Sequence, residues 1–143
     1  MRNGLMAALA LTLAVGCAAT DMEEEPMQIE GQEWRLTAFV HDDGRTEKPE
    51  GEISLQLDAA EARAFGSAGC NRFSGSYTLD GDTISFGPMA MTKRMCPPKL
   101  MANEDLFAAW LGQGGILSFE NGELRYQSQA GELLRFALAP ATE

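Results

Sequence analysis

The sequence predicts an α+β domain, in which an antiparallel, curved or barrel-like sheet of about seven strands packs with one helix. After residue 32, apolar and polar residues alternate over short runs, and this period of two is typical of half-buried strands. Turn residues such as Gly and Asn separate the runs. One stretch, residues 97–115, instead spaces its apolar residues at the period of an α-helix. A chain of 143 residues suits one domain.

The first two expected strands, EWRLTAF and ISLQLD, each place three apolar residues on one face. These residues are Trp34, Leu36 and Ala38 in the first strand, and Ile53, Leu55 and Leu57 in the second. The sequence between them, HDDGRTEKPEGE, is polar and predicts a loop. We therefore expect two half-buried strands joined by a long connection.

Further strands are expected in a hairpin and at the C-terminus. In YTLDGDTISF, Asp80-Gly81 favours a type I′ turn between two alternating strands. The C-terminal sequence ILSFENGELRYQSQAGELLRFAL predicts three more strands, which turn at Asn121-Gly122 and Ala130-Gly131. The last of these strands alternates three apolar residues, Leu134, Phe136 and Leu138.

The single expected helix lies in PPKLMANEDLFAAWLGQGG. Pro97 and Pro98 suit a helix start, because the missing N–H of proline costs nothing there. The acidic residues Glu104 and Asp105 are placed toward the positive end of the helix dipole. The glycines from Gly112 onward are expected to end the helix.

The N-terminal sequence predicts export and a lipid anchor. Arg2 precedes an apolar run, residues 5–15, that is too short to span a bilayer, which takes about 20 residues. The run ends in LAVGC, which resembles a bacterial lipobox, so residues 1–16 are expected to be a signal peptide and Cys17 to carry the lipid. The alternatives are an ordinary signal peptide cut nearby and an uncleaved buried helix. Ala18, not Asp, follows the lipidated position, which by resemblance to Gram-negative sorting rules indicates the outer membrane, facing the periplasm.

Residues 17–32 are expected to form an acidic tether, and residues 33–140 the folded domain. The extended tether would reach at most about 50 Å at roughly 3.3–3.6 Å per residue. With 21 acidic against 11 basic residues and no basic run, the chain lacks the Lys/Arg clusters that displace counterions from nucleic acid. An anionic membrane surface would repel the net charge of −10. We therefore expect membrane attachment only through Cys17, and no nucleic-acid partner.

Two cysteines remain once Cys17 carries lipid. In an oxidising periplasm an even pair most simply forms a disulfide, here between Cys70 and Cys96. The bond would join GSAGCNRFSGSY, whose Gly and Asn residues favour a bend or bulge, to the start of the helix. Closing a loop of 26 positions would stabilise the fold by roughly 3 kcal/mol.

Three motifs, GSAGCNRFSGSY, ISFGPMAMTKRMCP and NEDLFAAWL, precede a closing pair of strands and resemble the META domain family of HslJ-like bacterial heat-shock lipoproteins. The resemblance covers residues 34–138. It implies an α+β fold, often on an envelope lipoprotein, and roles in stress tolerance that include novobiocin resistance; it implies no enzymatic activity. The signature positions that it carries over, as structural residues, are Gly69, Cys70, Asn71, Gly75, Met91, Thr92, Cys96 and Glu104.

The sequence offers little support for catalysis. His41, the only histidine, lies in a polar loop, so nothing supports a Cys–His pair with Cys70 or Cys96. Two thiols and one histidine also fall short of the four ligands of structural zinc. The carboxylates of Asp80 and Asp82 flank a glycine and fit a turn. We therefore expect neither catalytic residues nor a metal or other cofactor.

The resulting functional hypothesis is a non-enzymatic envelope lipoprotein that acts as a binding or structural module in envelope stress or antibiotic tolerance. Its partner would be a protein, a cell-wall component or a small molecule. A first alternative is a Cu(I)-binding periplasmic protein, because Met89, Met91 and Met95 lie close to Cys96 and thioethers favour Cu(I). Methionine also fills irregular gaps in a core, which argues against this alternative. A second alternative is an enzyme of unknown class.

Overall fold

The computed structural model describes residues 28–140, which contain ten strands and one helix. The predicted signal peptide, Cys17 and most of the predicted tether lie outside these residues. In chain order the elements are β1 (Glu33–Val40), β2 (Thr46–Glu47), β3 (Ser54–Asp58), β4 (Arg63–Ser67), β5 (Arg72–Asp80), β6 (Thr83–Phe86), β7 (Ala90–Met91), α1 (Pro98–Gly112), β8 (Gly115–Glu120), β9 (Glu123–Ser128) and β10 (Leu133–Leu138).

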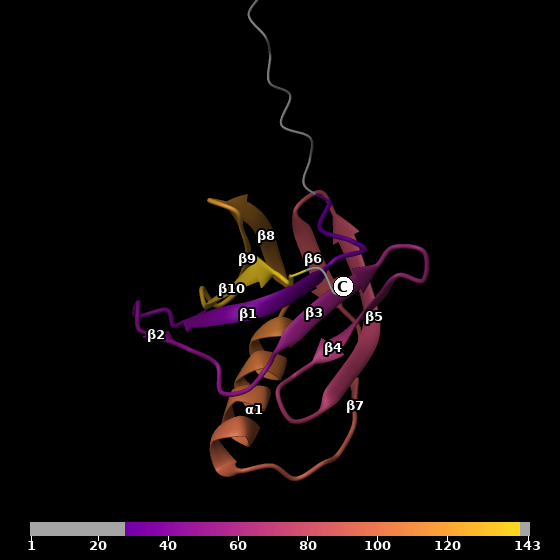
Figure 1. Cartoon of the computed structure of the whole chain (residues 1–143). Coiled ribbons are helices and arrows are strands. Elements are labelled where there is room, and N and C mark those ends of the chain that lie inside the picture. The colour runs from indigo at the N-terminus through magenta and orange to yellow at the C-terminus, as the bar shows by residue number, and fades with distance from the viewer. Residues whose placement is uncertain (1–27, 141–143) are drawn as a thin grey trace, which may run out of the picture.

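Eight strands form a closed antiparallel barrel, which confirms the predicted α+β class with a barrel-like sheet (Figure 1). The order around the barrel is β1–β3–β4–β5–β6–β8–β9–β10, and β10 pairs with β1 to close it. The short strands β2 and β7 pair with β1 and β5. The shortest seam joins β6 to β8 through the pairs Thr83–Ile116 and Ile84–Gly115. Closure pairs the edges that an open sheet of this size would expose.

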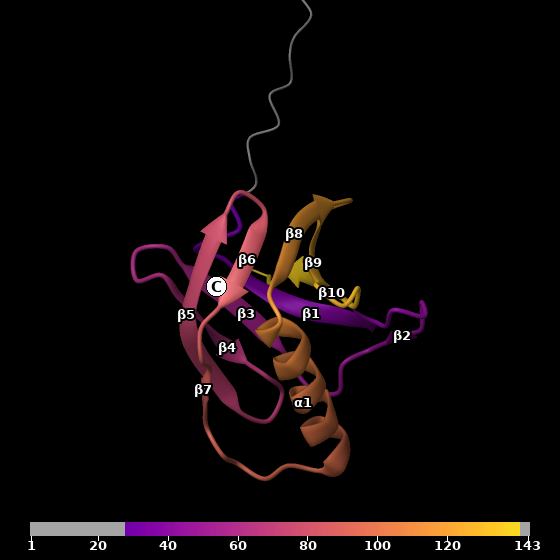
Figure 2. The ribbon, with the colours of Figure 1, turned by 180° about the vertical axis from the view of Figure 1, so that it is seen from behind.

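Helix α1 lies at the lower end of the barrel in both ribbon views (Figures 1 and 2). It begins as predicted, with Pro97 at the cap position and Pro98 as the first helical residue. It ends at Gly112, and Gly114, with a left-handed φ of 73°, leads the chain into β8. The dipole role expected for Glu104 is wrong, because the first turn holds no acidic residue and the Glu104 side chain is buried.

The barrel interior and one side of α1 share a single hydrophobic core. Of the six apolar residues predicted to share a face in the first two strands, five belong to this core. Ala38 is buried but does not share that face, because it lies opposite the outward-facing Arg135. Phe39 is also buried, because a register shift between Leu36 and Ala38 turns the following residue inward. From α1, Phe107 and Trp110 complete the core, with the Trp110 ring packed edge-on against Phe39. No helix within residues 28–140 has the length and apolar character needed to cross a membrane.

Two turns show how far local sequence specifies the strands. The predicted turn at Asn121-Gly122 is confirmed, and both residues have the positive φ of a type I′ turn, 53° and 79°. The type I′ turn predicted at Asp80-Gly81 is wrong. Asp80 still belongs to β5 and pairs with Thr83, so the loop is residues 81–82, and only Gly81 has a positive φ, as in a type II′ turn.

Some strands were not predicted. The sequence suggested about seven, whereas the structure adds β4 and the two-residue strands β2 and β7. In the last strand the expected alternation holds for Leu134 and Phe136, which are buried, but Leu138 is half exposed at the strand end.

Candidate functional site

A buried polar network surrounds Asn71 in the connection between β4 and β5. The backbone N–H of Asn71 donates to Oε2 of Glu104 at 2.6 Å, and its side-chain Nδ2 donates to Oε1 at 2.7 Å. Both residues are at least 95% buried. One carboxylate of α1 therefore holds both the backbone and the side chain of this connection, and such charge-assisted bonds are among the stronger ones in proteins.

The other polar atoms of Asn71 bind the segment that follows β7. Its Oδ1 accepts bonds from the hydroxyl of Thr92 at 3.0 Å and from the backbone N–H of Arg94 at 2.6 Å. Its Nδ2 also donates to the carbonyl of Arg94 at 3.3 Å. Every hydrogen-bonding atom of the amide therefore has a partner, as burial requires. We call Asn71, Thr92, Glu104 and the backbone of Arg94 the Asn71 network.

A disulfide runs beside the Asn71 network. Cys70 and Cys96 are bonded, with their Cα atoms 6.0 Å apart, and Cys96 immediately precedes the prolines that start α1. Asn71 and the disulfide thus tie the same turn to the segment that precedes α1 by two independent means, and Asn71 also bonds the helix itself through Glu104. The signature residues that the sequence singled out lie around this joint, and none of its contacts resembles a catalytic pair.

The signature glycines serve close packing and backbone shape. A Cβ at Gly75 would lie 2.8 Å from Sδ of Met89 and 2.9 Å from the carbonyl oxygen of Pro88, so β5 and the segment before β7 approach too closely for a side chain. Gly69 has a φ of 112°, which an L-residue with a side chain rarely adopts. Gly69 therefore shapes the turn that presents Asn71, and Gly75 lets the segment before β7 pack closely against β5.

An open groove of about 560 Å³ lies on the barrel surface next to the Asn71 network. We call it the β5 groove, and its lining residues are Arg63, Phe65, Gly66, Arg72, Phe73, Ser74, Ala90, Met91 and Thr92. Its volume falls within the range of small-molecule sites, about 300–1,000 Å³. The lining combines aromatic and aliphatic side chains with two hydroxyls and two guanidinium groups.

Strand register places these groups in order across the groove. Phe65 of β4 lies opposite Ser74 of β5, and Ala90 of β7 lies opposite Ser74 on its other side. Paired residues project to the same side of a sheet, so these three side chains form the floor. Arg72 lies opposite Ser67, four residues along β4 from Arg63, which is about 13 Å at roughly 3.3 Å per residue.

The Asn71 network also fixes one end of the groove. The backbone N–H of Arg72 donates to Oγ1 of Thr92, and the N–H of Thr92 donates to the carbonyl of Arg72, each at 3.0 Å. The same Thr92 hydroxyl donates to Asn71. The signature residues Asn71 and Thr92 thus position the backbone that carries an exposed arginine.

The two groove arginines lack carboxylate partners within residues 28–140. No Asp or Glu oxygen of this part lies within ion-pair distance of Arg63 or Arg72. Asp58 lies opposite Arg63 in the β3–β4 register, but its Oδ1 accepts bonds from the backbone N–H groups of Ala60 and Glu61. Arg63 instead donates from Nη2 to the hydroxyl of Ser74 at 3.3 Å.

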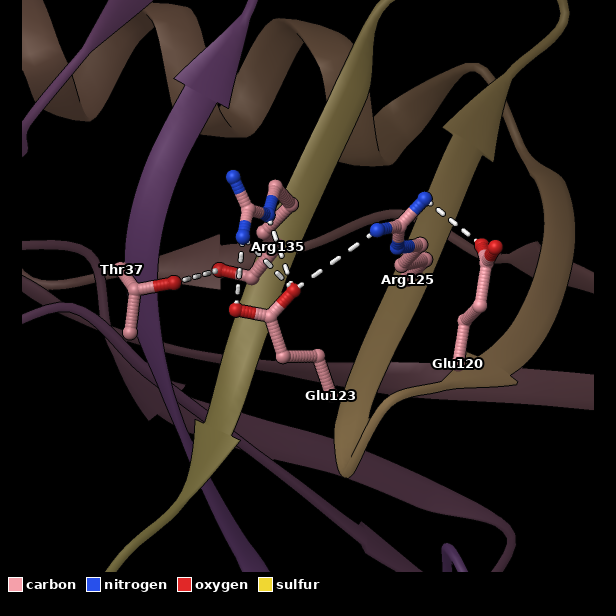
Figure 3. Close-up of polar contacts among 5 residues, drawn as sticks. All are labelled: Thr37, Glu120, Glu123, Arg125 and Arg135. Atoms are coloured by element: carbon pink, nitrogen blue, oxygen red, sulfur yellow. Dashed lines mark hydrogen bonds and ion pairs between the residues drawn. The ribbon is translucent and has the colours of Figure 1, made fainter.

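The arginines of β9 and β10 are placed differently (Figure 3). Glu123 lies between them and accepts from Nη2 and Nε of Arg135 at 2.8 and 3.0 Å, while its Oε2 lies 3.9 Å from Arg125. Arg125 also pairs with Glu120 at 2.7 Å. We call Glu120, Glu123, Arg125 and Arg135 the β9–β10 ion cluster. Figure 3 also shows Thr37 of β1, whose hydroxyl donates to the carbonyl of Arg135 at 3.1 Å.

The residues considered for metal or thiol chemistry lie in different surroundings. Met89 and Met91 pack against the hydrophobic core, whereas Met95 is 89% exposed. His41 is not a freely solvated loop residue: its ring packs edge-on against Trp110, and its Nε2 lies 3.2 Å from Glu47. Within residues 28–140, no group of three or more His, Cys, Asp and Glu side chains is placed to hold a metal ion.

Two buried tyrosines have perturbed ionisation. Burial, reinforced by the hydrogen bond that its hydroxyl donates to Glu30 at 2.5 Å, raises the pKa of Tyr77 well above 10. Burial and the negative charge of Glu132 raise the pKa of Tyr126 in the same direction. The Tyr126 hydroxyl donates to the carbonyls of Trp110 and Leu111, at 2.8 and 3.1 Å, where α1 ends. Both hydroxyls are therefore structural donors, with no role in proton transfer that their contacts would support.

Sequence reasoning missed the groove itself. It identified Met91 and Thr92 through the family resemblance, but not Arg63, Phe65 or Arg72. One available signal was the alternation of Arg63, Phe65 and Ser67 in EARAFGS, which would have marked an aromatic side chain on a polar outer strand face.

Comparison with known proteins identifies one family. The sequence model of the META domain matches residues 27–141. No curated protein matches the chain.

Solved structures share the fold. An NMR structure of a protein from Burkholderia xenovorans aligns with a TM-score of 0.68 at 20% identity, covering 99% of this chain and 100% of that chain. A second NMR structure aligns with a TM-score of 0.58 at 21% identity, covering 77% and 91%. A crystal structure of a DUF4847 family protein from Bacteroides vulgatus ATCC 8482 has a TM-score of 0.56 at 14% identity, covering 80% and 96%. At these identities the similarity shows the fold alone.

Proposed function

The chain belongs to the META domain family, and we propose that it is a non-enzymatic lipoprotein of the bacterial envelope whose barrel acts as a binding module under envelope stress. The β5 groove is the proposed binding site. The observation that carries this proposal is the position of the groove, because its rim is held by the residues of the family signature. A structural joint that served stability alone would have no need to order an exposed arginine.

The lining of the groove supports binding rather than catalysis. Its described lining residues include hydroxyls, guanidinium groups and apolar side chains, but no Cys, His, Asp or Glu. General acid–base and nucleophilic catalysis use such groups in pairs, within hydrogen-bond reach of each other. Cys70 and Cys96, the thiols nearest to the groove in sequence, are consumed in the disulfide. A non-enzymatic role is therefore the proposal that these contacts favour.

The proposed location follows from the N-terminal sequence. The lipobox-like LAVGC would place a lipid on Cys17 after export, and Ala18 favours the outer membrane. Ile29 packs against the core and the N–H of Gly31 donates to the carbonyl of Leu57, so the tether would be shorter than predicted, residues 17–27. It would let the barrel sample a layer up to about 40 Å from that membrane at roughly 3.3–3.6 Å per residue. The module would therefore meet its ligand in the periplasm, close to the membrane surface.

Deletion of the gene tests the proposed role. The deletion strain should become more sensitive to envelope stress or to antibiotics, and wild-type protein supplied in trans should restore tolerance. Protein carrying Cys17→Ser should restore it less well, and intact mass of the membrane-purified wild type should show the acylated cysteine. Unchanged sensitivity under heat, detergent and antibiotic challenge would overturn the stress role, and an unmodified Cys17 would overturn the anchor.

A further inference from the structure

We propose that the β5 groove binds a small amphiphilic anion, a carboxylate or phosphate group carried on an apolar chain. This inference rests on the proposed binding function and names the chemistry of its ligand. The anionic group would lie between Arg63 and Arg72, and the chain would lie over Phe65 and Ala90.

The charge distribution indicates an anion. The whole sequence has 21 acidic and 11 basic residues, so most surfaces of this protein are expected to be negative. The β5 groove departs from this composition, because both of its charged lining residues are arginines. Guanidinium groups bind carboxylates and phosphates through paired N–H donors. Ser74 adds a hydroxyl that is already oriented by Arg63 and can donate its own proton to a bound oxygen.

The floor of the groove indicates an apolar chain. Outward-facing positions on barrel strands are normally polar, yet Phe65 projects outward from β4 and remains only half-buried. Ala90 of β7 projects to the same side across Ser74 and extends the apolar surface. Met91, in contrast, lies opposite Phe73 and packs against the core. An inorganic anion would leave this surface in contact with water. A ligand with an apolar chain would cover it, and removing apolar area from water favours binding.

The surroundings of the groove favour a single small molecule over a membrane surface. A second groove, of about 340 Å³, shares Phe65 and is lined by the acidic residues Glu30 and Asp58. An anionic bilayer pressed against the barrel here would face these carboxylates as well as Arg63. A small ligand can occupy the arginine side alone. The two acidic residues thus restrict the occupant to one that does not extend beyond Phe65.

Three probes separate the parts of the proposed ligand. Octyl phosphate below its micelle concentration, octyl glucoside with the same chain and no charge, and inorganic phosphate are titrated calorimetrically into the full chain, exported and carrying Cys17→Ser. We expect octyl phosphate to bind at least tenfold more tightly than either other probe. Equal binding of octyl glucoside, or equal binding of inorganic phosphate, would overturn the proposal, because the ligand would then need only one of the two chemistries.

Charge-matched variants locate the binding. Arg63→Gln with Arg72→Gln should weaken octyl phosphate binding at least tenfold, whereas Arg125→Gln with Arg135→Gln, which removes the same charge from the β9–β10 ion cluster, should leave it within twofold. Circular dichroism shows whether each variant is folded, and Ser74→Ala gives a milder change in the same groove. Equal losses in the two double variants would indicate a general charge effect and overturn the site.

Three outcomes test this inference separately from the proposed function. Binding of phosphatidylglycerol vesicles without binding of octyl phosphate would overturn the small-molecule ligand in favour of membrane docking. A sensitive deletion strain that is restored fully by the Arg63→Gln, Arg72→Gln protein would keep the envelope role and overturn the groove as its site. A deletion strain with unchanged sensitivity, together with specific octyl phosphate binding, would keep the groove as a binding site and overturn the envelope role.

Discussion

Two outer surfaces of one barrel each carry a pair of arginines, and their surroundings differ. On β9 and β10, Arg125 and Arg135 share the carboxylate of Glu123 (Figure 3). On β4 and β5, Arg63 and Arg72 face a hollow with an aromatic floor and no carboxylate of residues 28–140 within ion-pair distance. The guanidinium groups of Arg125 and Arg135 already bind carboxylates, so an anionic ligand would have to replace those contacts. Within residues 28–140, the guanidinium groups of Arg63 and Arg72 have no such contacts to replace and lie beside apolar surface, so they can bind an anionic ligand directly.

The two surfaces also differ in what lies beneath them. Under the groove, the Asn71 network and the disulfide hold the β4–β5 turn to α1. Under the β9–β10 ion cluster, the inward residues Leu124 and Tyr126 belong to the apolar core. Ala64 and Phe73, the inward residues beneath the groove, belong to the same core, so both surfaces rest on hydrophobic packing, and the groove surface is held in addition by polar and covalent links. Each of the following changes should act mainly on one surface.

Loss of the disulfide should have the largest effect. Replacing Cys70 and Cys96 by Ala should lower the free energy of unfolding by about 3–4 kcal/mol, because the unfolded chain regains the entropy of a closed loop of 26 positions. Urea denaturation measures the loss, and dithiothreitol added to wild type should reproduce most of it. Hydrogen exchange should accelerate in β5 and β7 before β9 and β10. Uniform acceleration of hydrogen exchange across the barrel would show that the disulfide does not stabilise β5 and β7 in particular.

Asn71→Ala should cause the second largest loss in the free energy of unfolding. The substitution leaves the buried carboxylate of Glu104 without its side-chain donor and the hydroxyl of Thr92 without its acceptor, and should cost about 2–3 kcal/mol in unfolding free energy. Asn103→Ala on α1 is the matched control, since its Oδ1 accepts a single bond at an exposed site and its loss should cost less than about 1 kcal/mol. Equal losses in unfolding free energy for the two substitutions would contradict the claim that the Asn71 network stabilises the fold more than a single exposed hydrogen bond does.

The β4–β5 turn, with its disulfide and the Asn71 network, and the β5 groove differ in how far the sequence could predict them. Glycine, proline and cysteine constrain the backbone locally, so the bend near Gly69, the helix start at Pro98 and the pairing candidates Cys70 and Cys96 could be proposed from residue types alone. The contact of Asn71 with Glu104 joins residues 33 positions apart, and either residue by itself fits a solvated surface. Only the fold brings them together.

The groove was missed for a related physical reason. The five residues of β4, RAFGS, contain one small inward residue, Ala64, and an outward Phe65, which inverts the usual pattern of large residues inside and polar residues outside. Period-two reasoning therefore assigned no strand there. The turn at residues 80–82 was misplaced by one residue because Asp-Gly and Gly-Asp both occur in LDGDT, and strand register decided between them.

Loss of the Tyr126 hydroxyl, which lies under the ion-cluster surface, should have the third largest effect on stability. Tyr126→Phe removes the donor to the carbonyls of Trp110 and Leu111 and should lower the free energy of unfolding by about 1–2 kcal/mol at neutral pH. Tyr77→Phe is the control, because its acceptor Glu30 is partly exposed to water and can be hydrated when the hydroxyl is lost, so its cost should be smaller. A larger cost for Tyr77→Phe would show that the helix end does not depend on this bond.

Tyr126 also gives the fold a dependence on alkaline pH. Its pKa in the folded state is raised above the ordinary value near 10, so the folded chain keeps a proton that the unfolded chain loses. The stabilisation is fully present below pH 10 and should decrease as the pH rises from there, since the unfolded state then binds fewer protons. Urea midpoints measured from pH 8 to 11 should fall less steeply in the Tyr126→Phe variant than in wild type. Parallel curves for the two proteins would contradict the assignment.

The smallest expected effects distinguish the two arginine pairs directly. Arg125→Gln with Arg135→Gln should lower the free energy of unfolding by about 1 kcal/mol, because their ion pairs with Glu123 are half-buried but still reached by water and salt, which screen them. Arg63→Gln with Arg72→Gln should change it by less than about 0.5 kcal/mol, since no ion pair within residues 28–140 is lost. Urea denaturation at low and at high NaCl measures both variants. The loss of stability in the Arg125→Gln, Arg135→Gln variant should become smaller as the NaCl concentration rises. Any loss in the Arg63→Gln, Arg72→Gln variant should not depend on NaCl in this way. If the groove pair instead stabilised the fold more than the cluster pair, its arginines would be structural, and the reason to assign them to a ligand would disappear.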